Sequence, residues 1–309
     1  MPASTGLPFD LLVFDTGIDG PHLLISAGVH GDEFEPIVAL LQLAELFQGA
    51  TENPALKAGK LTLIPCVNEN AFQLGHRCAS DGLDLARTCP GRADGSLTEQ
   101  AAHSLSQCIR AADFYIDLHT GGTEFDIFPL TGYMLHPDRH VLCQQRRMAH
   151  SFGLPLVWGT TPNLDGRSLS VARDAGVPAI YCEFGGAARC SVSGVDAYVS
   201  GCLNVLADLE MISPRTSPEP ARYVVEDLRE DSGHLQICNP SPIDGLFLPH
   251  VALGNMIEKG ELLGTVSALN GNGHREIRSD SAGLVILLRT FPRVHAGKSV
   301  GVVIEMPKP

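Results

Sequence analysis

The sequence predicts an α/β protein in which helices flank a mixed sheet, followed by a smaller all-β domain. Short apolar runs alternate with segments of helical periodicity up to about residue 210. Several of these runs are apolar on both faces, as strands inside a covered sheet are. Residues 212–223 (ISPRTSPEPARY) then carry three prolines and end the helical pattern. We therefore predict one domain at residues 1–214 and a β-rich domain at residues 215–309.

The apolar runs give the predicted strands, and the segments between them give the predicted helices. Strands are expected at LLVFD (11–15), HLLISA (22–27), LTLIPCVN (61–68), FYIDLHT (114–120) and VPAIYCEFGG (177–186). Helices are expected at 34–47, 97–111, 138–152 and 194–210. After the proline-rich break, short strands punctuated by Gly, Pro and Asn indicate a compact β module. We expect this module to cover a site or to build a homo-oligomer interface.

Composition narrows the class of protein. The formal net charge is −13, which disfavours nucleic acid and anionic membranes as partners, since both bind basic patches. No stretch approaches the roughly 20 consecutive apolar residues of a membrane-spanning helix. The N-terminus has no secretory signal pattern, and the nine cysteines form no C-x-x-C pair. We expect reduced thiols in a cytoplasmic protein.

The stretch GVHGDEFEP (28–36) places a histidine and a carboxylate where a predicted strand gives way to a helix. Ligands of open α/β sheets bind beyond the carboxyl ends of the strands. His30 and Glu33 occupy that position, and glycines beside them allow a tight backbone. The H-x-x-E spacing favours a metal site. A helix-capping acid beside a loop histidine would show the same sequence pattern.

Two more strands end in groups that can carry chemistry. In FYIDLHTGG the alternation places Tyr115, Asp117 and His119 on one face, and His119 stands at the strand end. Two histidines and one glutamate are a ligand set of hydrolytic zinc sites. In VPAIYCEFGG the apolar strand ends in Glu183, a buried carboxylate that fits a general base.

The segment 68–91 starts at the end of another strand and is rich in glycine and charge. The segment holds Arg77 and Arg87, and an arginine here is suited to polarising an acyl oxygen or to gripping a substrate carboxylate. Asp84 is suited to accepting the second N–H of a metal-bound imidazole. The alternative is a solvated loop with ordinary surface charges.

The chain resembles the succinylglutamate desuccinylase/aspartoacylase family of carboxypeptidase A-like zinc hydrolases. Four segments carry this resemblance in their order along the chain: GVHGDE, the loop from GHR to DLARTCPG, DLHTG and VPAIYCEFGG. The resemblance extends over nearly the whole chain. It implies a zinc-carboxypeptidase-like catalytic domain at 1–214, one Zn²⁺ per chain, and a small N-acyl substrate. The residues that match the family's ligands are His30, Glu33 and His119; Glu183 matches its general base and Arg77 its oxyanion-stabilising arginine. Asp84 and Arg87 fall on the D-x-N-R element.

The sequence departs from that family pattern at Ala86, where the family has an asparagine that helps to hold the substrate carboxylate. Arg87 then binds an anion alone or with help from Arg167 or Arg189. We expect a zinc-dependent deacylase that cleaves the amide of an N-acyl amino acid or a related N-acyl amine. Two alternatives remain open at this point: a metallocarboxypeptidase acting on a small peptide, and a non-catalytic metabolite-binding member of the fold.

Overall fold

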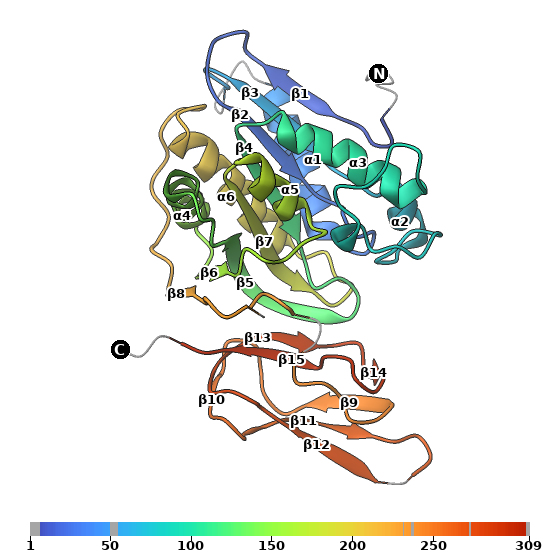
Figure 1. The fold of residues 1–309 in the computed structure, drawn as a ribbon. Coiled ribbons are helices and arrows are strands. Elements are labelled where there is room, and N and C mark those ends of the chain that lie inside the picture. Colours follow the sequence, from blue (N-terminus) through green and yellow to red (C-terminus); the bar gives the residue numbers. More distant parts are fainter. Residues whose placement is uncertain (1–6, 50–54, 231, 236–237, 272, 307–309) are drawn as a thin grey trace.

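A computed structural model describes residues 7–49, 55–230, 232–235, 238–271 and 273–306. Figure 1 shows a larger part, in which helices flank a sheet, and a smaller part made of strands alone. The predicted fold class is confirmed: a mixed α/β protein with a further β-sheet region towards the C-terminus.

The larger part contains all the helices of the described residues. Its elements are β1 (Leu12–Asp15), β2 (His22–Ser26), α1 (Phe34–Gln48), β3 (Lys60–Ile64), α2 (Glu69–Leu74), a 3-10 turn η1 (Leu85–Arg87), α3 (Leu97–Arg110), β4 (Phe114–His119), β5 (Phe125–Met134), α4 (Arg139–Phe152), β6 (Leu156–Thr160), α5 (Ser168–Ala175), β7 (Ala179–Gly186) and α6 (Val192–Asp208). All five predicted strands and all four predicted helices of this region are present, with ends shifted by a few residues.

The remaining elements are strands. They are β8 (Tyr223–Glu226), β9 (Gly245–Pro249), β10 (Met256–Ile257), β11 (Leu262–Ser267), β12 (His274–Arg278), β13 (Gly283–Arg289), β14 (Arg293–Val294) and β15 (Gly301–Ile304). In the described residues β12, β11, β9 and β14 form a separate four-stranded sheet. This agrees with the Gly-, Pro- and Asn-punctuated pattern of the sequence.

The main sheet runs in the order β1-β3-β2-β4-β7-β5-β13-β10, with β6 and β8 continuing beside β5 and with β15 beside β13. The centre of the sheet is parallel: β2 pairs with β3 and β4, and β4 pairs with β7. Because the central strands run the same way, the residues that follow β2, β4 and β7 meet at one edge of the sheet.

Apolar side chains cover both faces of this sheet, which explains why the central strands are apolar throughout. One core cluster contains buried residues of α1, α4 and α6, and the other contains buried residues of α3 and α5. In β2, four of the five residues are buried. The sheet is therefore the middle layer of three.

The C-terminal strands do not all lie apart from the main sheet. Strand β13 pairs with β5 through Leu287↔Ile127, and β8 pairs with β6. The main sheet therefore continues across residue 214, and the division into domains at 214/215 stays a prediction.

Among the described helices, none is long and apolar enough to cross a bilayer. Eight of the described cysteines, at positions 66, 78, 89, 108, 143, 182, 190 and 202, are thiols outside any disulfide.

Candidate metal centre

The turn between β2 and α1 brings His30 and Glu33 together. Glu33 is the N-cap residue of α1, but its side chain caps no backbone N–H. Instead Glu33 Oε1 lies 2.7 Å from Nδ1 of His30. Gly31 lets this turn pass close to α2, because a Cβ built on it would lie 2.0 Å from the carbonyl carbon of Ala71. The contact of Glu33 with His30, and the lack of a capping hydrogen bond from its side chain, decide the alternative raised above. The helix-capping alternative for Glu33 therefore does not describe its side chain.

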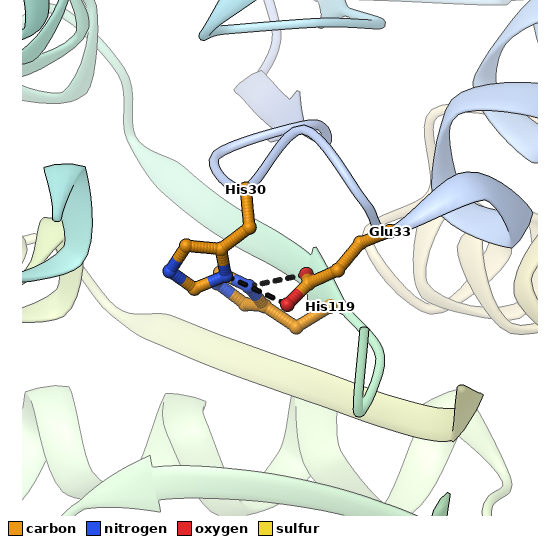
Figure 2. A group of neighbouring side chains, drawn as sticks. All are labelled: His30, Glu33 and His119. Atoms are coloured by element: carbon orange, nitrogen blue, oxygen red, sulfur yellow. Dashed lines mark hydrogen bonds and ion pairs between the residues drawn. The ribbon is translucent and has the colours of Figure 1, made fainter. Parts of the chain in front are cut away.

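The end of β4 adds His119 to this pair (Figure 2). Its Nδ1 lies 3.0 Å from Glu33 Oε2, and the backbone N–H of Thr120 donates to the same oxygen. The two imidazole rings have centroids 5.3 Å apart. One donor atom from each of His30, Glu33 and His119 lies within 4.8 Å of the others. Residues 86 positions apart thus form one compact donor set.

The outer nitrogen of each histidine contacts an aspartate. Nε2 of His30 lies 3.2 Å from Asp84 Oδ1, as the sequence suggested for Asp84. Nε2 of His119 lies 3.2 Å from Asp117 Oδ2. A carboxylate that accepts the outer N–H fixes the tautomer and the orientation of a ligating imidazole. In both rings this leaves Nδ1 facing Glu33.

Sequence reasoning grouped Asp117 with His119 on one strand face but gave it no role. In the structure Asp117 is almost fully buried and accepts hydrogen bonds from the hydroxyls of Ser26, at 2.7 Å, and Ser168. Ser26 lies opposite Asp117 on the neighbouring strand. The available signal was the i, i+2 spacing of Asp117 and His119, because such residues point to the same side of a strand.

Glu183 lies beside His119, in register on the adjacent parallel strand β7. Its side chain is buried, and Oε2 has no hydrogen-bond partner among the described residues. Burial raises the pKa of Glu183 to about 8. Burial also opposes the charged form of Glu33, but the two imidazoles outweigh it and hold the pKa of Glu33 well below its usual range.

Three arginines stand around the same cavity. Arg77 donates through Nε and one terminal nitrogen to Asp84 Oδ2, at 3.1 and 3.0 Å. Arg87 lies at the end of η1, and Arg167 immediately precedes α5. A single cavity is lined by the side chains of His30, Glu33, Arg77, Arg87, His119, Arg167 and Glu183.

The structure thus brings together all eight site residues expected from the sequence. Seven line the cavity, and Asp84 joins it through His30 and Arg77. Arg189 is placed elsewhere: it pairs with Asp126 and is not among the lining residues. Tyr181 also lines the cavity, two residues before Glu183 on β7, and sequence reasoning missed it.

The donor set fits a divalent cation. Two imidazole nitrogens and a buried, ionised carboxylate converge within 4.8 Å. The other nitrogen of each ring, Nε2, already contacts an aspartate carboxylate. Nitrogen and carboxylate donors of this kind suit Zn²⁺ and other first-row divalent metals.

Comparison with known proteins gives related sequences and folds. The family model of the succinylglutamate desuccinylase/aspartoacylase catalytic domain matches residues 19–209. The chain is 28% identical over 298 residues to N-alpha-acetyl-L-2,4-diaminobutyric acid deacetylase of Halomonas elongata, covering 93% of this chain and 83% of that protein.

Two solved structures are similar along nearly their whole length. The succinylglutamate desuccinylase/aspartoacylase from Rhodobacter sphaeroides superposes with a TM-score of 0.85 at 27% identity, covering 97% of this chain and 90% of that one. The product-bound ectoine utilization protein EutE (DoeB) from Ruegeria pomeroyi gives a TM-score of 0.84 at 28% identity, with 95% and 87% covered.

Proposed function

The chain belongs to the succinylglutamate desuccinylase/aspartoacylase family, and from that premise we propose that it is a zinc-dependent deacylase that hydrolyses the amide bond of an N-acyl amino acid. The observation that carries this proposal is the position of Glu183. Its buried carboxyl group lies in register beside His119, in one cavity with the three candidate metal ligands and Arg77. The similarity to a deacetylase of an N-acyl amino acid supports the same reaction class.

His30, Glu33 and His119 would hold one Zn²⁺ per chain. A bound Zn²⁺ supplies Lewis acidity towards an amide carbonyl and lowers the pKa of water to about 7. Asp84 and Asp117 keep the two imidazoles oriented by accepting from their outer nitrogens. The protein therefore brings the ligands together before any substrate binds.

Glu183 carries the proton. A carboxyl whose pKa is raised towards neutrality accepts a proton readily and returns it readily, as a general base and acid must. Glu183 takes a proton from the water that attacks the acyl carbon. It then delivers that proton to the leaving nitrogen as the amide bond breaks, so the products are a free amine and a carboxylic acid.

The arginines act on the two ends of the substrate. Arg77 is held by Asp84 in the cavity wall and donates to the oxygen that becomes negative as the carbonyl is attacked. Removing one such donor typically costs ~2.7–4 kcal/mol of transition-state stabilisation. Arg87 and Arg167 line the same cavity and bind the substrate carboxylate.

Substituting Glu183→Gln tests the assignment. We expect the variant to retain its zinc and to lose at least ~10²-fold in kcat, since the amide cannot carry the proton. Zinc content by elemental analysis and acetate release from N-acetyl amino acids are the measurements. Glu35→Gln is a matched control, because Glu35 is also buried but contacts Ser191 outside the cavity. A Glu183→Gln enzyme with normal turnover would contradict the proposal.

The same assay separates the other two readings of the sequence. A metallocarboxypeptidase would cleave free peptides and spare their C-terminal amides. A non-catalytic binding protein would release no product from N-acetyl, N-formyl or N-succinyl amino acids, although it would still bind metal.

A further inference from the structure

Much of the cavity wall beyond the reacting groups is apolar, although the hydroxyl-bearing Thr120, Thr160 and Tyr181 also line the cavity. Its buried apolar residues come from distant parts of the chain: Ile127 and Met134 from β5, Leu164 from the segment after β6, Leu169 from α5 and Leu287 from β13. Each is less than a tenth exposed. A side chain that enters this cavity therefore loses its water and gains mainly van der Waals contacts.

The carboxylates that line the cavity already have partners or a proposed role. Glu33 and Glu183 are the lining carboxylates among the described residues. Glu33 is shared between the two imidazoles, and Glu183 is the proton carrier proposed above. An ammonium group on the substrate side chain would meet three guanidinium groups and, in the part of the chain that the structure describes, no further carboxylate. Burying a charge without a partner is strongly unfavourable.

An anionic side chain on the substrate is also disfavoured in this cavity. Arg77 is balanced by Asp84, which it contacts through two nitrogens. Arg167 forms no ion pair with any carboxylate that the structure describes, and burial together with nearby Arg87 lowers its pKa to about 10. One carboxylate near Arg87 and Arg167 relieves this repulsion, and the α-carboxylate of the substrate supplies it. A second carboxylate, on the substrate side chain, would have to compete with the α-carboxylate for Arg87 and Arg167, because Arg77 is already paired with Asp84.

Resting on the proposed deacylase function, we propose that the substrate amino acid has an uncharged, apolar side chain, which packs against the wall that contains Leu164 and Met134. Ala86 belongs to the same wall and presents a methyl group where an asparagine would present an amide. Among the described residues, the specificity thus comes from the lack of a further carboxylate as much as from the apolar contacts.

Substrate selectivity of the zinc-loaded wild-type enzyme is the first test. The panel is N-acetyl-L-leucine, N-acetyl-L-methionine, N-acetyl-L-aspartate and Nα-acetyl-L-2,4-diaminobutyrate, with formyl and succinyl counterparts, and the released acid is quantified. We expect kcat/KM for leucine and methionine to exceed that for both charged side chains by about 100-fold, because the charged ones are desolvated without a partner. Equal or higher kcat/KM for either charged side chain overturns the inference.

The panel also separates this inference from the function on which it rests. If some acyl amino acids are hydrolysed and the charged ones are preferred, the deacylase proposal stands and the apolar specificity falls. If no member of the panel is hydrolysed, both fall.

Leu164→Glu with Leu164→Gln as its isosteric control is the second test. We expect Leu164→Glu to raise the diaminobutyrate-to-leucine ratio of kcat/KM by about 10-fold over Leu164→Gln, since only the glutamate supplies a counter-charge. Zinc content and melting temperature verify that each variant is folded. An unchanged ratio in folded variants would show that the substrate side chain does not contact Leu164, and would overturn the proposal. If neither variant folds, the wild-type panel alone decides.

Discussion

The two candidate histidine ligands are supported by aspartates at the same distance but in different surroundings. Asp84 lies in the irregular segment before η1, its side chain is 20% exposed, and it is paired with Arg77. Asp117 lies on the central strand β4, its side chain is 2% exposed, and two serine hydroxyls donate to it. One support is a partly solvated ion pair and the other is a buried network.

Each of these two aspartates also connects a candidate metal ligand to an arginine of the cavity. Asp84 binds Arg77 directly. Asp117 accepts from Ser168, the first residue of α5, which directly follows Arg167. We therefore expect different effects when each aspartate is lost. Loss of the buried Asp117 should lower both the free energy of unfolding and the affinity for metal, whereas loss of the partly exposed Asp84 should lower mainly metal affinity and activity.

Asp117→Asn should give the largest effect. It leaves His119 without its buried counter-charge, and breaking a buried pair by removing one partner costs ~3–5 kcal/mol of the free energy of unfolding. Zinc affinity should fall by about 10–100-fold, as when such supporting groups are lost elsewhere. Urea denaturation of the metal-free protein and chelator competition measure the two quantities. Wild-type values for both would show that Asp117 does not hold His119.

Ser168→Ala should rank second. The hydroxyl donates to Asp117 in a fully buried setting, so its loss should cost ~1.5–3 kcal/mol of unfolding free energy. KM should rise more than kcat falls, because the start of α5 also positions Arg167. Ser168→Thr keeps the donor and should restore part of both quantities. If Thr and Ala behave alike, the hydroxyl is not what matters.

Asp84→Asn should destabilise the metal-free protein by only ~1 kcal/mol or less, since partly exposed ion pairs contribute little. Its zinc affinity should nevertheless fall by about 10–100-fold, and kcat should fall because Arg77 loses its anchor. The same denaturation and chelator experiments apply. A loss of stability as large as that of Asp117→Asn would remove the contrast between the two supports.

The pH dependence of unfolding should show the smallest difference. Burial opposes the charge on Asp84, but His30 and Arg77 outweigh it and hold its pKa well below the ordinary value near 3.8. A carboxyl with a lowered folded-state pKa contributes stability above its unfolded-state pKa and loses it as the pH falls. The metal-free wild type should therefore lose more stability than Asp84→Asn between pH 6 and pH 3. Parallel curves in urea would contradict this.

Local patterns accounted for much of the fold. The apolar strands β2, β4 and β7 and the helices between them follow from periodicity, because burial on both faces leaves a continuous apolar run. Strand β5 was missed, since FDIFPLTGYM mixes a proline, a glycine and polar residues. The joining of β13 to β5 was missed as well, because strand pairing over such a separation leaves no local signal.

The sequence by itself determined which chemical groups stand at the strand ends: His30 and Glu33 after β2, His119 at the end of β4, and Glu183 on β7. The tertiary structure decided which groups surround them. Contacts such as Asp84 to His30 and Ser168 to Asp117 join residues more than 50 positions apart. They depend on how the segment before η1 and the start of α5 pack onto the sheet, and local periodicity does not encode such contacts between distant parts of the chain.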